Sequence, residues 1–196
     1  MMKPFPVKVS LSDSCFILGA LMILILPLKL LLSVILAAAI HECSHIFALF
    51  LFRMPIQSIH IHSSGVSILT PPMPPLPELL CALAGPMGSL LCLLLAHRFP
   101  LLALCALLQG IFNLLPVYPL DGGRVFRCAI ALVLPFHADS ISKFTSLGVT
   151  AGLCGYFVVL FLRTLDGFFL LLCISFLLKI CHPRKTPCKE DAHWVQ

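Results

Sequence analysis

Two histidines and a glutamate lie at metal-binding spacing inside an apolar stretch of the chain. Residues 41–45 read His-Glu-Cys-Ser-His, an H-E-x-x-H motif. Residues i and i+4 share one face of a helix, so His41 and His45 can bind the same metal ion. Glu42 lies about 100° further round the helix, where it can reach water at the metal without being a ligand. The motif therefore predicts a zinc centre with a general base, which is a site suited to peptide hydrolysis.

A third protein ligand must come from elsewhere in the chain, because a catalytic zinc takes three protein ligands and keeps one position open. Asp121 is the best candidate, since Pro119 precedes it and Gly122-Gly123 follow it. Such backbone breaks end a helix and let a carboxylate turn back toward its neighbours. The alternative is a solvent-exposed aspartate in a helix-ending turn, and we would prefer it if the H-E-x-x-H motif were absent.

The composition places this motif in a membrane. Of the 196 residues, 60% are hydrophobic and 11% are charged, with a mean hydropathy of +1.06. A soluble domain carries about 25% charged residues. Ionisable groups inside a membrane span are costly, at about 3 kcal/mol each for a charged group at mid-helix, so they usually have a function. The formal net charge of +5 is spread over loops and tails, and we expect no nucleic-acid partner.

We predict an all-α polytopic membrane protein with about six transmembrane helices. The apolar segments are residues 15–28, 30–52, 79–96, 101–115, 144–162 and 167–180, whereas residues 125–135 are too short to span and are expected to be buried or interfacial. Six spans put both termini on one side of the membrane. Of the 13 Lys and Arg residues only Lys29, Arg98 and Arg163 then lie opposite, which predicts cytosolic termini.

The whole chain, residues 1–196, reads as a single integral-membrane domain. Its core is residues 30–124, followed by a helix pair at 144–180 and a polar tail at 181–196. The motif centre lies about ten residues, hence about 15 Å, from the cytosolic end of its span. We therefore expect the site to be submerged in the membrane but open toward the cytosol.

The segment between the second and third expected spans has a different pattern. Residues 56–68 alternate apolar and polar side chains around Ser63-Ser64-Gly65, which predicts a small β-hairpin. The proline-rich residues 71–77 predict an extended loop, and residues 1–14 predict a short polar tail. His60 and His62 share one strand face, and we interpret that face as partly solvated rather than as a metal site.

Three motifs in one order resemble the site-2 protease family of intramembrane metalloproteases. They are H-E-x-x-H in one span, Ala-Gly-Pro at 84–86 in the next, and N-x-x-P-x-x-P-L-D-G-G at 113–123 after the third. The likeness covers residues 41–124, and the string from 118 to 124 is most similar to the branch of stage IV sporulation protein FB.

The resemblance implies a site-2 protease core and assigns roles to six residues. One zinc ion per chain would be held by His41, His45 and Asp121, with Glu42 as the catalytic base. Asn113 and Pro119 match positions that lie beside the active site and the substrate. The hairpin is similar to the family's membrane-associated β element, which can present a substrate as an extended strand.

The resemblance also implies a function in regulated intramembrane proteolysis. The expected activity is a zinc endopeptidase that cleaves membrane-tethered regulators, such as a pro-sigma or anti-sigma factor, in or near their spans. The expected setting is sporulation at a bacterial inner membrane. The partners are the lipid bilayer and a membrane-embedded protein substrate, and the sequence leaves open an inhibitory or activating membrane partner. Only residues 181–196 follow the last expected span, so we expect no nucleotide-binding CBS domain.

A polytopic metal transporter, or a non-catalytic membrane metal-binding protein, is the alternative interpretation. Glu42 separates the two, because a transporter needs no non-ligating base beside the metal. Transporters also often contain internal repeats, and the sequence shows none.

Overall fold

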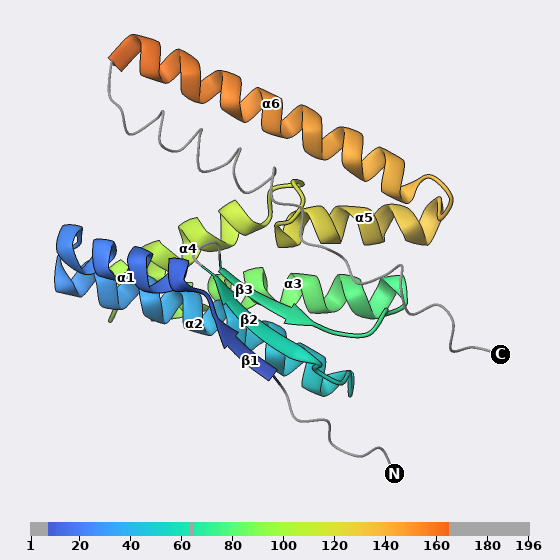
Figure 1. Ribbon diagram of the computed structural model, residues 1–196, viewed down its shortest axis with the longest axis horizontal. Helices are drawn as coiled ribbons and strands as arrows, with labels where there is room; N and C mark the ends of the chain where they lie inside the picture. The colour runs from blue at the N-terminus through green and yellow to red at the C-terminus, as the bar shows by residue number, and fades with distance from the viewer. Residues whose placement is uncertain (1–7, 63–64, 165–196) are drawn as a thin grey trace. The chain divides into compact units, whose positions relative to one another are not determined.

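The computed structural model describes residues 8–62 and 65–164 of the chain, which divides into two units, Met1–Leu115 and Pro116–Gln196. The elements of the first unit are β1 (Lys8–Leu11), α1 (Asp13–Ile25), α2 (Leu28–Leu51), β2 (Ser58–His62), β3 (Gly65–Leu69), α3 (Pro75–Leu91), the short 3-10 helix η1 (Cys92–Leu95) and α4 (Pro100–Asn113). The described part of the second unit contains α5 (Asp121–Val133) and α6 (Ala138–Thr164). The fold is mostly helical with one small sheet (Figure 1).

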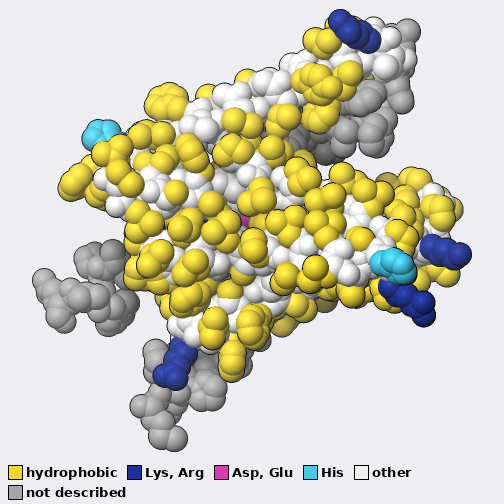
Figure 2. Space-filling model, turned by 180° about the vertical axis from the view of Figure 1, so that it is seen from behind, with side chains coloured by type: hydrophobic (Ala, Val, Ile, Leu, Met, Phe, Trp, Pro, Cys, Tyr) yellow, Lys and Arg dark blue, Asp and Glu magenta, His cyan; other side chains and the backbone are white. Residues whose placement is uncertain are grey.

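Three described helical segments are long and apolar enough to cross a membrane. They are Leu28–Leu51, Pro75–Leu95 and Ala138–Thr164, and Cys15–Ile25 and Pro100–Asn113 are shorter apolar helices. Many large hydrophobic side chains lie at the surface (Figure 2), among them Leu24 and Phe50 with 84% and 80% of their area exposed. These features suggest a membrane protein. Six spans stay a prediction, and the expected span at 167–180 and the tail at 181–196 lie outside the described residues.

Helices α2, α3 and α4 pack against one another and form the core of the first unit. One buried cluster contains Ala37, Cys92, Leu102 and Ala106. Small residues let the backbones approach closely: a Cβ added at Gly88 would lie 2.7 Å from the Cβ of Ser44. Close approach through small residues is how helices associate where lipid removes the hydrophobic driving force.

The predicted hairpin is confirmed, and a third strand extends it. β2 and β3 pair antiparallel, and β1 pairs with β2 in parallel to give the order β1-β2-β3. The prediction of a polar tail over residues 1–14 was therefore wrong for residues 8–11, which form β1, and for Asp13, which begins α1. Val9 pairs with Ile59 and Leu11 with Ile61, so the short strand continues the alternation of its neighbour.

The proline-rich segment differs from its prediction in its second half. Residues 71–74 are non-helical as expected, but α3 begins at Pro75 and includes Pro77. The first turn of a helix tolerates proline, because its amide groups have no partner within the helix anyway. Pro86 lies further inside α3 and is buried.

In the second unit, the glycine pair after Asp121 begins a helix rather than ending one. Asp121 is the first residue of α5, where a carboxylate interacts favourably with the helix dipole. A Cβ at Gly123 would lie 2.7 Å from backbone atoms of Val117 and Tyr118, so only glycine permits this tight connection. The peptide between Tyr118 and Pro119 is cis, and the Tyr118 amide donates to Ser146 Oγ of α6 at 3.0 Å.

Candidate metal centre

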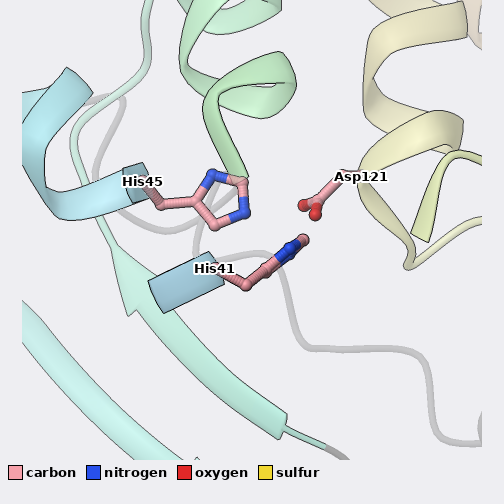
Figure 3. Close-up of side chains that lie close together, drawn as sticks. All are labelled: His41, His45 and Asp121. Atoms are coloured by element: carbon pink, nitrogen blue, oxygen red, sulfur yellow. The ribbon is translucent and has the colours of Figure 1, made fainter. Parts of the chain in front are cut away.

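The two histidines of the H-E-x-x-H motif lie one turn apart on α2 and are both buried. Their exposed fractions are 2% for His41 and 9% for His45. The ring centroids are 4.9 Å apart with the planes nearly perpendicular, and one ring nitrogen of each lies within 4.8 Å of the other (Figure 3). Two imidazoles at this separation can share one metal ion with only small side-chain adjustments.

A backbone carbonyl fixes the tautomer of His45. The Nδ1 atom of His45 lies 2.8 Å from the carbonyl oxygen of Cys81 on α3. A carbonyl only accepts, so Nδ1 must carry the proton and the lone pair of the neutral ring is on Nε2.

His41 is held by two side chains, one at each ring nitrogen. Ser89 Oγ on α3 lies 2.9 Å from Nδ1, and the side-chain nitrogen of Asn113, the last residue of α4, lies 3.4 Å from Nε2. An amide nitrogen donates, so Nε2 accepts and Nδ1 donates to the serine hydroxyl. Both histidines therefore carry their lone pair on Nε2; at His41 a metal ion would take the place of the Asn113 amide, whose contact is long at 3.4 Å.

Gly85 of α3 lies directly against these two Nε2 atoms. A Cβ at this position would lie 2.2 Å from His45 Nε2 and 2.8 Å from His41 Nε2. The residue is buried, and a side chain at position 85 would collide with both imidazoles. Glycine at position 85 therefore lets α3 pack directly against the two histidines of α2.

The other predicted site residues lie on three segments. Glu42 follows His41 on α2 and is half-buried. Asn113 is half-buried and contacts His41, as described above. Pro119 lies in the connection before α5, and Asp121, also half-buried, is the first residue of that helix in the second unit (Figure 3). The roles of these residues stay predictions.

Two contacts at the histidines were not expected from the sequence. Ser89 belongs to none of the motifs identified in the sequence, and the Cys81 carbonyl leaves no trace in a side-chain pattern. A hydroxyl in an apolar helix could have indicated the contact of Ser89, because a buried hydroxyl needs a hydrogen-bond partner. His60 was interpreted as part of a solvated strand face, and its ring lies between Ser10 of β1 and Ser58 of β2.

Comparison with known proteins gives three consistent likenesses. The family model of Peptidase family M50 matches residues 80–154, which include Asn113 and Asp121 and begin after the H-E-x-x-H motif. The chain is 29% identical over 109 residues to Zinc metalloprotease MJ0392 of Methanocaldococcus jannaschii, a match that covers 48% of this chain and 32% of that protein. This chain thus spans about a third of the relative's length.

The likeness in fold extends over nearly the whole chain. The solved structure of the Site-2 Protease from Methanocaldococcus jannaschii is similar with a TM-score of 0.66 and 18% sequence identity, covering 92% of each chain. The mostly helical architecture with its small three-stranded sheet is therefore a site-2 protease-like fold. The matched family is a peptidase family and the curated relative is a zinc metalloprotease, while the solved structure is similar in fold.

Proposed function

We propose that this chain is a zinc endopeptidase that cleaves protein substrates within or near the membrane. The observation that carries the proposal is the pair of buried imidazoles on α2, whose Nε2 lone pairs lie beside Gly85 with Glu42 next in the chain. The helix that holds them is long and apolar enough to cross a membrane. The likeness to Peptidase family M50 supports the same proposal of a peptidase.

We further propose that one zinc ion is held by His41, His45 and Asp121. Two imidazoles and one carboxylate are a donor set found at catalytic zinc sites, and they leave the fourth position open. The two histidine tautomers already suit the metal. Asp121 supplies its carboxylate from the first turn of α5.

Glu42 acts as the general base and then as the general acid. Zinc, when bound, supplies Lewis-acid activation of water and of the scissile carbonyl. Glu42 accepts a proton from the attacking water as the water oxygen bonds to the carbonyl carbon. It then transfers that proton to the leaving nitrogen as the C–N bond breaks. Asn113 and Pro119 support the active site and the bound substrate.

The substrate is a membrane-embedded protein whose helix unwinds near the cut. A helical segment hides its carbonyls in i to i−4 hydrogen bonds, so cleavage favours substrates with helix-weakening residues at that place. Membrane-tethered regulators such as a pro-sigma or anti-sigma factor fit this class. Regulated proteolysis of the sporulation type, with an inhibitory or activating membrane partner, is the corresponding biological setting.

The chain would act as one integral-membrane domain with about six spans. We place the termini in the cytosol and the protein in a bacterial inner membrane, because 10 of the 13 Lys and Arg residues then lie on the cytosolic side. The small sheet presents the substrate as an extended strand. Water reaches the zinc from the cytosolic side.

The test compares membrane-protein N-termini in the native host carrying the wild-type chain or the Glu42→Gln variant. Glu78→Gln, at the start of α3, is the matched control for loss of a carboxylate. We expect peptide ends inside or near a client's membrane span with the wild type and the control, and their loss with Glu42→Gln. Identical ends in all three strains at equal protein levels would contradict the protease and favour a transporter or a metal-binding protein.

A further inference from the structure

Ser89 is fully buried on α3 and contacts His41. Its exposed fraction is 0%, and its Oγ lies 2.9 Å from His41 Nδ1. On the other side of the serine, α4 passes so close that a Cβ at Gly110 would lie 3.1 Å from Ser89 Cβ. The hydroxyl therefore lies between two helices with little freedom to leave the imidazole.

This contact is not the usual behaviour of a serine in an apolar helix. Such hydroxyls commonly bond to a carbonyl one turn earlier in their own helix. Ser33 does so with the Lys29 carbonyl at 2.8 Å, and Ser44 does so with the Ile40 carbonyl at 2.8 Å. Ser89 instead contacts a ring on the neighbouring helix, which points to a role for that ring.

The direction of the hydrogen bond follows from the other ring nitrogen. The proposed site uses His41 Nε2 as the metal ligand, so the proton of the neutral ring is on Nδ1 and the serine oxygen accepts it. An acceptor at Nδ1 holds the ring in one orientation and makes Nε2 a better ligand. His45 receives the same support from the Cys81 backbone carbonyl, which no substitution removes.

We propose that Ser89 is a positioning residue for His41 and thereby sets the metal affinity of the site. By accepting the Nδ1 proton it keeps the Nε2 lone pair available to the metal ion. The proposal rests on the proposed function, in which His41 is a zinc ligand. It adds a side chain from α3 to a site that sequence motifs assign to other segments.

The experiment measures the zinc dissociation constant of the purified full-length chain in detergent, by competition with a coloured chelator. The variants are Ser89→Ala, Ser89→Thr, His41→Ala and, as the matched control, Ser33→Ala, which removes a hydroxyl from α2 away from the histidines. We expect Ser89→Ala to bind zinc about 10- to 100-fold more weakly. Ser33→Ala should bind like the wild type, and Ser89→Thr, which keeps the hydroxyl, should recover most of the affinity.

The thermal unfolding midpoint of each metal-free variant separates positioning from packing. A serine needed only for packing would lower the midpoint without changing the zinc affinity of the folded protein. Wild-type affinity in Ser89→Ala, with affinity lost in His41→Ala, would overturn the positioning role alone. Equal affinity loss in Ser89→Thr and Ser89→Ala at equal midpoints would also overturn it. Equal zinc binding by wild type and His41→Ala would overturn the proposed metal site and the positioning role together.

Discussion

Replacing Gly85 by alanine should abolish tight metal binding while leaving most of the fold intact. The added Cβ would lie 2.2 Å from His45 Nε2, 2.5 Å from His45 Cε1 and 2.8 Å from His41 Nε2, against an ordinary contact distance of 3.4–4 Å. His45 would have to move by more than 1 Å to restore the 3.4 Å limit. That movement strains the hydrogen bond to Cys81, which belongs to the same helix as Gly85.

The size of the effect follows from these contacts. Overpacking of this kind costs about 1–3 kcal/mol of folding stability. Loss of the support that orients one ligand weakens metal binding about 10- to 100-fold. Since the methyl group disturbs both histidines, we expect a loss of zinc affinity of at least about 100-fold, the upper end of that range.

The assay for Gly85→Ala is the chelator competition, combined with thermal unfolding of the metal-free protein. Gly152→Ala on α6 is the matched control, because a Cβ there meets no atom within 4 Å. The control should bind zinc normally and unfold at the same or a slightly higher temperature, since alanine favours a helix. Wild-type zinc affinity in Gly85→Ala would refute the assignment of the two Nε2 atoms as ligands facing this glycine.

Three other substitutions give distinct outcomes. Glu42→Gln should retain zinc, because Glu42 is not a ligand. The variant should lower the turnover of a reconstituted membrane substrate by about 10²- to 10⁴-fold. Loss of zinc from this variant would contradict the role of Glu42 as a base. Asp121→Ala should lose zinc affinity, as measured by chelator competition, and an unchanged affinity would remove Asp121 from the ligand set. Gly123→Ala should lower the thermal unfolding midpoint, since its Cβ would lie 2.7 Å from the Val117 and Tyr118 backbone. The expected cost in folding stability is about 1–3 kcal/mol. An unchanged midpoint would count against this tight connection.

The features predicted well from the sequence are those carried by local patterns. The long apolar run around His41 predicted a helix over residues 30–52, and α2 covers Leu28–Leu51. Alternation of apolar and polar residues within 56–68 predicted the hairpin, and β2 and β3 pair as expected. In both cases the period of the side chains determines which face is buried, so the element is encoded within a dozen residues.

The features missed depend on partners that are distant in the chain. β1 is four residues long and exists because Val9 and Leu11 align with β2, about fifty positions later. Ser89 contacts a ring 48 residues earlier, and the Cys81 carbonyl has no side-chain signature. Gly122-Gly123 was read as a helix end, whereas the close approach of Val117 requires glycine inside the first turn of α5. Propensity rules consider residues that are close in sequence, whereas the structure at these positions depends on residues that are close in space.

The candidate site was likewise predicted from the sequence only in part. The two histidines and Glu42 were identified by spacing alone, because i and i+4 share a helix face. The spacing could not reveal which ring nitrogen would bind the metal. That information comes from the Cys81 carbonyl, Ser89 and Asn113, which fix both tautomers.

X-ray absorption at the zinc edge of the purified protein tests the metal centre most directly. We expect two imidazole nitrogens and oxygen donors at about 2.0 Å, with one imidazole lost in the His45→Ala variant. The chain contains 10 cysteines, and Cys43 lies within the motif itself. A sulfur shell at about 2.3 Å, or an unchanged spectrum in His45→Ala, would contradict the assigned ligands.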